Sequence, residues 1–176
     1  MRTVALIAGL LVGFLALMIG VFLLIGWRLP DRHTAAKSVR LSRSPRDVYA
    51  LVRNFEAAPR WRSDVKNVEM LPPVEGHIRF REHGSNGEIT FQVDEDIPNK
   101  QIVTRIVDTD LGFGGRWMFE FLDEEAAACT LKITEHGEVS NVFFRFMSRY
   151  VFGHTATIDR YLRDVSAAFG ETYEPE

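Results

Sequence analysis

The hydrophobic residues of this chain follow two unlike patterns. Thr3–Trp27 carries no charge and no proline, and 20 of its 25 residues are hydrophobic. As a helix rising about 1.5 Å per residue, this stretch would be ~37 Å long, which exceeds the ~30 Å hydrocarbon core of a bilayer. The pattern predicts a transmembrane anchor over residues 1–28, with Trp27 and Arg28 at the membrane surface.

A cleaved signal peptide is the alternative for this segment, since Arg2 forms a short basic region before the apolar run. The run is longer than the roughly 7–15 residues of a signal core, and no small-x-small motif closes it. Basic residues are more numerous after the run than before it, which favours a single-pass membrane protein with a cytoplasmic domain. Gly9 and Gly13 have the spacing that lets two membrane helices form a weak homodimer, although glycine is also common in such helices.

The rest of the chain predicts one folded domain. Residues 29–37 contain proline, charged and small residues and are expected to be a linker, followed by the domain at 38–170 and a tail at 171–176. Ser44–Asp47 has the features of a helix start, with serine at the N-cap, proline at the first helical position and an acidic residue closing the capping box. A second short helix or turn is expected at 56–62.

Alternation of apolar and polar residues then predicts a sheet. The predicted strands are 37–42, 65–71, 77–83, 88–96, 101–108, 116–122 and 129–136. The turns between successive strands from residue 65 onward are short, which indicates an antiparallel meander. From Asn141 to Phe169 the apolar residues recur at helical spacing, which predicts one continuous helix of 29 residues with a single apolar stripe.

This order of elements resembles the SRPBCC superfamily, which includes START-type lipid carriers and the polyketide cyclase/dehydrase group. The segments that carry the resemblance are Ser44–Val52, Phe55, Pro59–Trp61, Gly115–Phe121, Thr130–Glu138 and Ile158–Leu162. The resemblance implies an α+β helix-grip fold, in which a curved antiparallel sheet wraps around the long C-terminal helix and leaves a cavity between them. It implies a hydrophobic small molecule or a lipid as the ligand.

An aromatic cavity lining is expected from the residues placed on the inner face of the sheet and on the helix stripe. The candidate ligand-binding residues are Trp61, Phe80, Phe91, Trp117, Phe119, Phe121, Ile133, Phe143, Met147, Tyr150, His154 and Tyr161. Apolar pockets with a few polar groups are typical small-molecule sites. The alternative is that these side chains simply fill the core.

The composition of the chain excludes several classes of protein. The chain has 176 residues, a net charge of −3 and one cysteine, and about 40% of the residues after position 27 are hydrophobic. These values fit one membrane segment and one domain, and they exclude disorder, a disulfide framework and a multi-domain enzyme. No metal, cofactor or phosphate-binding motif is present, and the scattered arginines form no stripe for nucleic acid.

Three polar residues are candidate acid–base groups. Glu82 and Glu135 fall on strand faces predicted to point inward, and His154 falls on the helix stripe. A carboxyl in an apolar setting has a raised pKa and can act as a general acid or base. Alternatively, the glutamates lie at the rim, solvated or paired with arginines such as Arg79 or Arg105, and His154 is a hydrogen-bonded core residue.

Three functions therefore follow from the sequence. The favoured one is a membrane-tethered domain that binds a hydrophobic small molecule or lipid. The second is a cyclase/dehydrase-like enzyme that uses Glu82, Glu135 or His154. The third is a protein-interaction module recruited to the membrane by the N-terminal helix.

Overall fold

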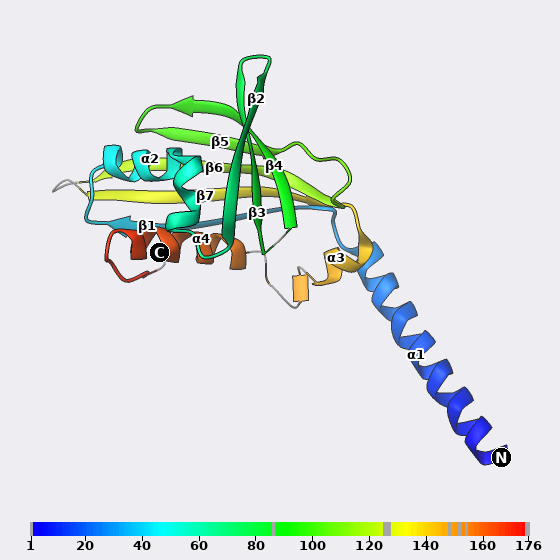
Figure 1. The fold of residues 1–176 in the computed structure, drawn as a ribbon. Helices are drawn as coiled ribbons and strands as arrows, with labels where there is room; N and C mark the ends of the chain where they lie inside the picture. The colour runs from blue at the N-terminus through cyan, green and yellow to red at the C-terminus, as the bar shows by residue number, and fades with distance from the viewer. Residues whose placement is uncertain are drawn as a thin grey trace.

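The computed structural model describes residues 2–85, 87–124, 128–147, 149–150, 153 and 155–174. Its helical elements are α1 (Arg2–Arg28), α2 (Pro45–Arg53), the 3₁₀ turn η1 (Phe55–Arg60), α3 (Val142–Met147) and α4 (Ala156–Ala168). Its strands are β1 (Arg32–Leu41), β2 (Val65–Val74), β3 (His77–Gly84), β4 (Gly87–Ile97), β5 (Gln101–Ile106), β6 (Phe113–Glu124) and β7 (Ala128–Val139). Figure 1 shows α1 projecting away from a domain made by the other elements.

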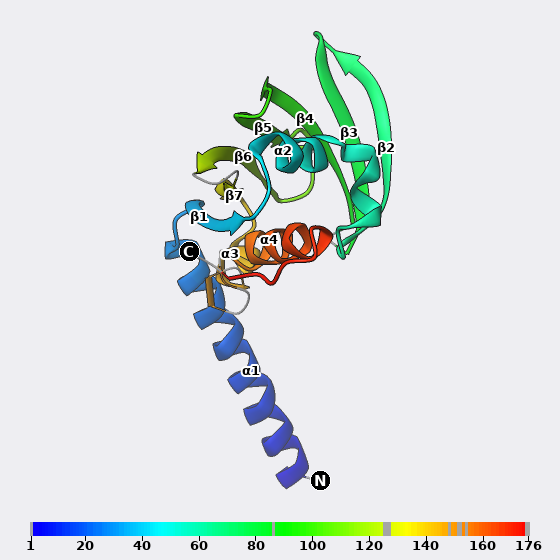
Figure 2. The ribbon, with the colours of Figure 1, turned by 90° about the vertical axis from the view of Figure 1, so that its left-hand side faces the viewer.

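The seven strands form one antiparallel sheet in the order β1-β7-β6-β5-β4-β3-β2. Strands β2 to β7 are a meander, and β1 returns to pair with β7 from Arg32↔Glu138 to Leu41↔Cys129. The sheet curves around α2 and α4, which lie against its concave side (Figure 2). We call this side the inner face and the opposite side the outer face. The architecture is the α+β helix grip, as predicted.

Local sequence signals explain the start of α2. The Ser44 hydroxyl accepts a hydrogen bond from the Asp47 backbone N–H at 3.3 Å and donates one to Asp47 Oδ2 at 2.7 Å. Pro45 occupies the first helical position, where its missing N–H costs nothing. The predicted N-cap at Ser44 and the proline at the first helical position are confirmed, and the helix buries Val48 and Val52.

The core lies between the inner face and α4. Leu131 and Ile133 of β7 are fully buried beneath Ile158, Leu162 and Val165 of α4. Phe80, Phe119 and Phe121 are also buried in this cluster. The period-2 alternation of the strands therefore sorts apolar residues onto one face, where the helix covers them.

Two boundaries differ from the predictions. Strand β1 begins at Arg32, so it takes in most of the segment that was expected to be a linker, because each of its residues pairs with β7. The long C-terminal helix is two helices, α3 and α4, with Gly153 between them at φ +75°. A residue with that backbone angle cannot continue an α-helix, so the prediction of one continuous helix is wrong.

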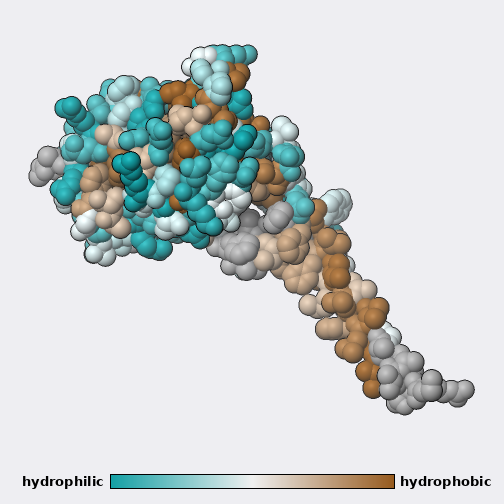
Figure 3. Space-filling model, in the orientation of Figure 1, coloured by the Kyte–Doolittle hydropathy of each residue, from teal (hydrophilic) through white to brown (hydrophobic). Residues whose placement is uncertain are grey.

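Helix α3 packs against the end of α1. The Phe22 and Phe146 rings meet edge to face at 4.4 Å. Gly26 lies so close to Val142 that a Cβ at this position would overlap the Val142 carbonyl oxygen. By length and composition alone, the Gly9–Arg28 part of α1 could cross a membrane, a property that a signal sequence shares. Its side chains are largely exposed, and Figure 3 shows the apolar surface along this helix.

Candidate functional site

Tyr161 is the centre of an aromatic group on the inner face. It is buried on α4, and its ring lies 5.3 Å from Trp61, 5.9 Å from Trp117 and 5.3 Å from Phe119. The rings meet at angles between 48° and 89°, which are the edge-on and tilted geometries that aromatic pairs favour. We call these four residues the Tyr161 cluster. It joins three elements: the end of η1, strand β6 and helix α4.

Glu135 adjoins this cluster on β7. It is the cross-strand partner of Trp117, so the two side chains lie next to each other on the same face of the sheet. Only 20% of its side chain is exposed. Burial raises the pKa of Glu135 to about 7, although its interaction with the Trp117 side chain opposes the rise. The Glu135 carboxyl is therefore poised to gain or lose a proton near neutral pH.

His33 lies next to this carboxyl. Its Nε2 is 3.9 Å from Glu135 Oε1, and its ring packs against Gly137, where a Cβ would collide with it. The contact depends on the β1–β7 register, in which His33 faces Gly137 and Ala35 faces Glu135. An imidazole and a carboxyl at this separation can exchange a proton through a small reorientation or a bridging water.

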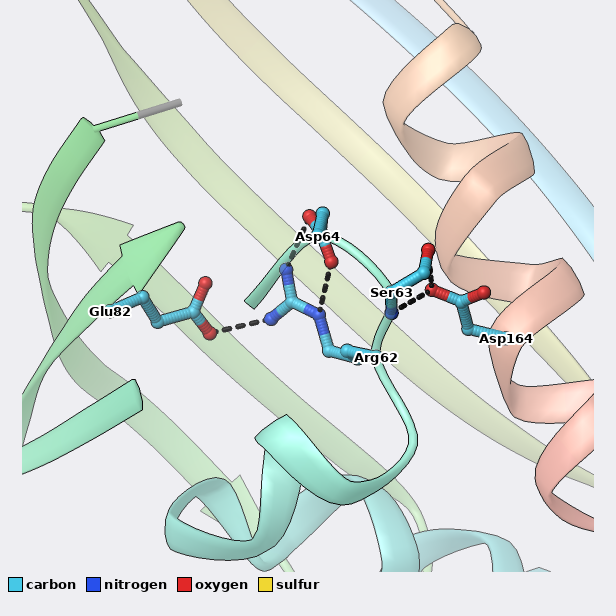
Figure 4. Close-up of polar contacts among 5 residues, drawn as sticks. All are labelled: Arg62, Ser63, Asp64, Glu82 and Asp164. Carbon is cyan, nitrogen blue, oxygen red and sulfur yellow. Dashed lines mark hydrogen bonds and ion pairs between the residues drawn. The ribbon is translucent and has the colours of Figure 1, made fainter. Parts of the chain in front are cut away.

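A second polar group is formed by Arg62, Asp64 and Glu82, and Figure 4 shows the contacts among these three side chains. Arg62 Nη1 donates to Glu82 Oε1 at 2.5 Å, while its Nε and Nη2 donate to the two oxygens of Asp64 at 3.1 and 2.9 Å. The guanidinium carbon lies 5.0 Å from the centre of the Tyr161 ring. Burial raises the pKa of Glu82, and the positive charge of Arg62 opposes that rise.

The loop that carries Arg62 is fastened to α4. The Ser63 backbone N–H and hydroxyl both donate to Asp164 Oδ2, at 2.7 and 2.8 Å (Figure 4). Because Asp164 follows Tyr161 by three residues, the same turn of the helix holds the loop and the cluster. Helix α4 therefore holds both the Arg62 loop and the Tyr161 cluster in place.

The candidate acid–base residues have separate surroundings. Glu82 pairs with Arg62, and not with Arg79 or Arg105, which were the sequence alternatives. Arg105 instead pairs with Asp94 at 2.9 Å. Glu135 lies on the inner face, as the alternation of its strand indicates. His154 lies outside the described residues.

The predicted lining residues outside the Tyr161 cluster have different surroundings. Phe80 stacks on Phe55 at 4.3 Å and on Phe91 at 5.3 Å, so this part of the lining is packed. Met147 is partly buried on α3. Phe143 and Tyr150 are 56% and 60% exposed, so they lie outside the buried part of the predicted lining. They belong to the segment that packs beside α1 rather than beneath the sheet.

Sequence reasoning missed Arg62, Asp64 and His33. The arginine and the aspartate belong to a loop with no periodic pattern, and His33 was placed in the linker. The available signal was that a basic and an acidic residue flank a serine just before a strand, which is common on protein surfaces. Only the fold brings Glu82 from β3 to this pair.

The indole nitrogen of Trp61 is a buried hydrogen-bond donor in the Tyr161 cluster. In the part of the chain that the structure describes, Trp61 Nε1 is buried and makes no hydrogen bond. A buried donor without an acceptor carries a desolvation cost of about 1–3 kcal/mol. No group of three or more potential metal ligands occurs among the described side chains. The site is thus an aromatic surface with a carboxyl, an imidazole and an open indole donor.

Two pockets with described lining residues contain no member of the Tyr161 cluster, although the second includes His33, the neighbour of Glu135. One, of about 660 Å³, lies on the outer face, next to the glycine-rich turn before β6, and includes Arg105, Arg116 and His136. The other, of about 300 Å³, lies where α1 ends and β1 begins.

Comparisons with known proteins place this fold in a family. Residues 41–157 match the family described as polyketide cyclase / dehydrase and lipid transport. The chain belongs to this family. A search of curated proteins found no match. The match covers most of the polyketide cyclase/lipid transport domain described above, from the end of β1 into α4.

Solved structures share the fold of this polyketide cyclase/lipid transport domain. A START superfamily protein from Mycobacterium smegmatis has 19% identity and a TM-score of 0.64, with 77% of this chain and 96% of that chain covered. The ZhuI aromatase/cyclase from Streptomyces sp. R1128 has 15% identity and a TM-score of 0.65, over 78% and 93%. Truncated norcoclaurine synthase from Thalictrum flavum has 10% identity and a TM-score of 0.63, over 81% and 96%.

Proposed function

We propose that this protein is a membrane-tethered domain that binds a hydrophobic small molecule or lipid at the inner face, against the Tyr161 cluster. The family's description includes lipid transport, and norcoclaurine synthase, which shares the fold, has been solved in complex with dopamine and hydroxybenzaldehyde. Both facts support a ligand with an apolar or aromatic body. Neither identifies the ligand of this chain.

Glu135 is the observation that carries the proposal. A core stabilised only by packing gains nothing from a carboxyl among aromatic rings, because burial penalises its charged form. A ligand with a polar end would give that carboxyl a further partner besides His33. The open Trp61 donor nearby in the cluster could satisfy an acceptor on the same ligand. The expected ligand is therefore an apolar molecule with at least one hydroxyl, carbonyl or similar group.

Ligand extraction tests this proposal. The full-length protein, purified in detergent, is expected to release a defined apolar molecule that mass spectrometry identifies in an organic extract. Trp117→Ala should lower the amount retained, because the indole contacts both Glu135 and Tyr161. Met118→Ala is the matched control, since it removes a large side chain from the outer face of the same strand. Equal loss in both variants, or no retained molecule in the parent, would contradict the proposal.

The tether is supported by how α1 joins the domain. Only three residues separate α1 from β1, and α1 packs on α3 through Phe22 and Gly26. A helix that is part of the packed structure is a poor candidate for removal. Intact mass measurement of the mature protein is expected to include residues 1–28, and carbonate washing should leave the protein in the membrane fraction. A mass that begins after residue 28 would overturn the tether.

A cytoplasmic domain remains our proposal for the orientation, from the basic residues that follow α1. The single cysteine, Cys129, is buried, and burial raises its pKa to about 12, so it should react slowly. Ser85→Cys introduces an exposed thiol in the turn after β3. A membrane-impermeant maleimide should label it only after the cells are opened. Labelling of intact cells would reverse the orientation.

Catalysis is the second candidate function, and the raised pKa of Glu135 beside His33 favours it. In this case Glu135 acts as the acid–base group for a cyclisation or dehydration. Glu135→Gln should then abolish turnover of the extracted ligand and leave its binding unchanged. Under simple binding, the same variant changes affinity, and no conversion occurs in either protein.

A further inference from the structure

A basic pocket lies at the foot of α1, and of the residues that line it only His33 takes part in the functions above. It has a volume of about 300 Å³ and is formed where α1 ends, β1 begins and α3 crosses beside them (Figures 1 and 2). The residues that line it are Leu29, Pro30, Asp31, Arg32, His33, Thr34, Val139, Arg145 and Arg149. Three of these are arginines and one is a carboxylate, so the lining has an excess of positive charge.

Backbone carbonyls hold Arg145 in the pocket. Its guanidinium donates to the carbonyl oxygens of Val139 at 2.6 Å, Ser140 at 3.1 Å and Leu29 at 3.5 Å. These acceptors fix the position of the group but carry no formal charge. Its positive charge therefore remains available to an anion.

Arg149 and Arg32 add positive charge to the pocket. Arg149 is exposed, and within the described chain no carboxylate pairs with it. Arg32 pairs with Glu138 at 2.8 Å, but both side chains are more than half exposed, and such a surface pair is weak. An anion that reaches all three guanidiniums could compete with Glu138 for Arg32.

The position of the pocket relative to a membrane is inferred from the end of α1, which lies next to it. Trp27, in the last turn of that helix, is 70% exposed, and tryptophan favours the level of the lipid headgroups. The pocket residues begin two positions later, at Leu29. The exposed rings of Phe143 and Tyr150 lie on the segment that packs beside α1, and they add aromatic surface next to this helix. The arginines are thus placed where phosphate groups of lipids occur.

We propose that this pocket binds the phosphate of an anionic phospholipid at the membrane surface. The proposal rests on the membrane attachment of α1 given under the proposed function. A bound headgroup joins Arg145 of α3 and Arg149, just after this helix, to Arg32 at the start of β1. It therefore restricts rotation of the domain about the short Leu29–Asp31 connection and holds the inner face in a defined orientation to the bilayer.

Native mass spectrometry of the full-length protein, released from nanodiscs that contain equal amounts of phosphatidylglycerol and phosphatidylcholine, tests the site. Phosphatidylglycerol is expected to be retained preferentially. The double variant Arg145→Gln/Arg149→Gln should weaken its apparent affinity at least tenfold, and Arg149→Gln alone should weaken it measurably while Arg145 keeps its structural bonds. Equal retention of the two lipids would overturn the proposal.

The matched control removes two arginines elsewhere. Arg40→Gln/Arg46→Gln has the same loss of charge, and Arg40 is eight residues further along β1 than Arg32, or about 26 Å. This control should retain phosphatidylglycerol as the parent does; equal loss would show general charge attraction and refute a pocket. Displacement of the lipid by millimolar inorganic phosphate would show a site for free anions instead. Carbonate washing of the parent reports the tether separately, so the two proposals can fail independently.

Discussion

Glu135 gives the sharpest prediction, because its buried position couples folding to pH. The carboxyl has a pKa of about 7 in the folded protein and an ordinary value of 4.5 when it is exposed. The folded state therefore holds the proton more tightly than the unfolded state between these two values. The stability that this neutral carboxyl contributes is fully present below pH 4.5 and is lost as the pH rises through 7.

The magnitude follows from the size of the shift. Each pKa unit corresponds to about 1.4 kcal/mol, so a shift of roughly 2.5 units costs the folded protein about 3 kcal/mol across this range. Glu135→Gln replaces the carboxyl with an amide of the same shape that does not ionise. The free energy of unfolding of the variant, relative to the parent, should rise by about 3 kcal/mol between pH 4.5 and pH 7.5.

Urea denaturation in detergent at half-unit pH steps measures this difference, and NMR of a carboxyl-labelled protein reports the titration of Glu135 directly. Glu138→Gln is the control, since it removes an exposed carboxylate from the same strand, and its stability relative to the parent should stay nearly constant. If the difference between Glu135→Gln and the parent is the same at every pH, the carboxyl is not desolvated and the reasoning about the site is wrong.

Other changes test the packing around the site. Arg62→Met leaves the Glu82 carboxyl buried without its partner and should lower the free energy of unfolding by about 3–5 kcal/mol in urea denaturation. Phe80→Ala removes a buried ring that stacks on two others and should cost about 3–5 kcal/mol by the same measurement. Gly26→Leu should push α3 off α1, which increases the rate of tryptic cleavage after Arg145, while the urea midpoint of the domain stays unchanged.

The fold was predictable because its signals are local. Strand alternation, the N-cap at Ser44 and the short turns each depend on residues close in sequence, and together they specify the meander and α2. The same alternation placed Glu135 on the inner face. The extent of β1 was not predictable, because its first residues form a strand only through pairing with β7 about 100 positions away. His33 was misplaced for that reason.

The charged part of the site could not be predicted at all. Arg62 is buried because Asp64 and Glu82 both accept from it, and Glu82 arrives from β3 only when the sheet curls. The pattern of apolar and polar residues does not predict how the sheet curves. The prediction for Glu82 named arginines on the sheet, whereas the actual partner comes from the loop that Ser63 fastens to α4.

The break in the C-terminal helix was not predicted, because apolar residues continue at helical spacing on both sides of it. The apolar positions from Phe143 to Phe169 keep helical spacing throughout, so the pattern indicates a single buried stripe. In the structure, Tyr161 and Leu162 face the core, whereas Phe143 and Tyr150 are exposed beside α1. The helical spacing of apolar residues is the same whether their side chains are buried in a core or exposed on a surface. Periodicity alone therefore cannot separate the two cases, and Gly153, with its positive φ, lies between the exposed segment and the buried helix.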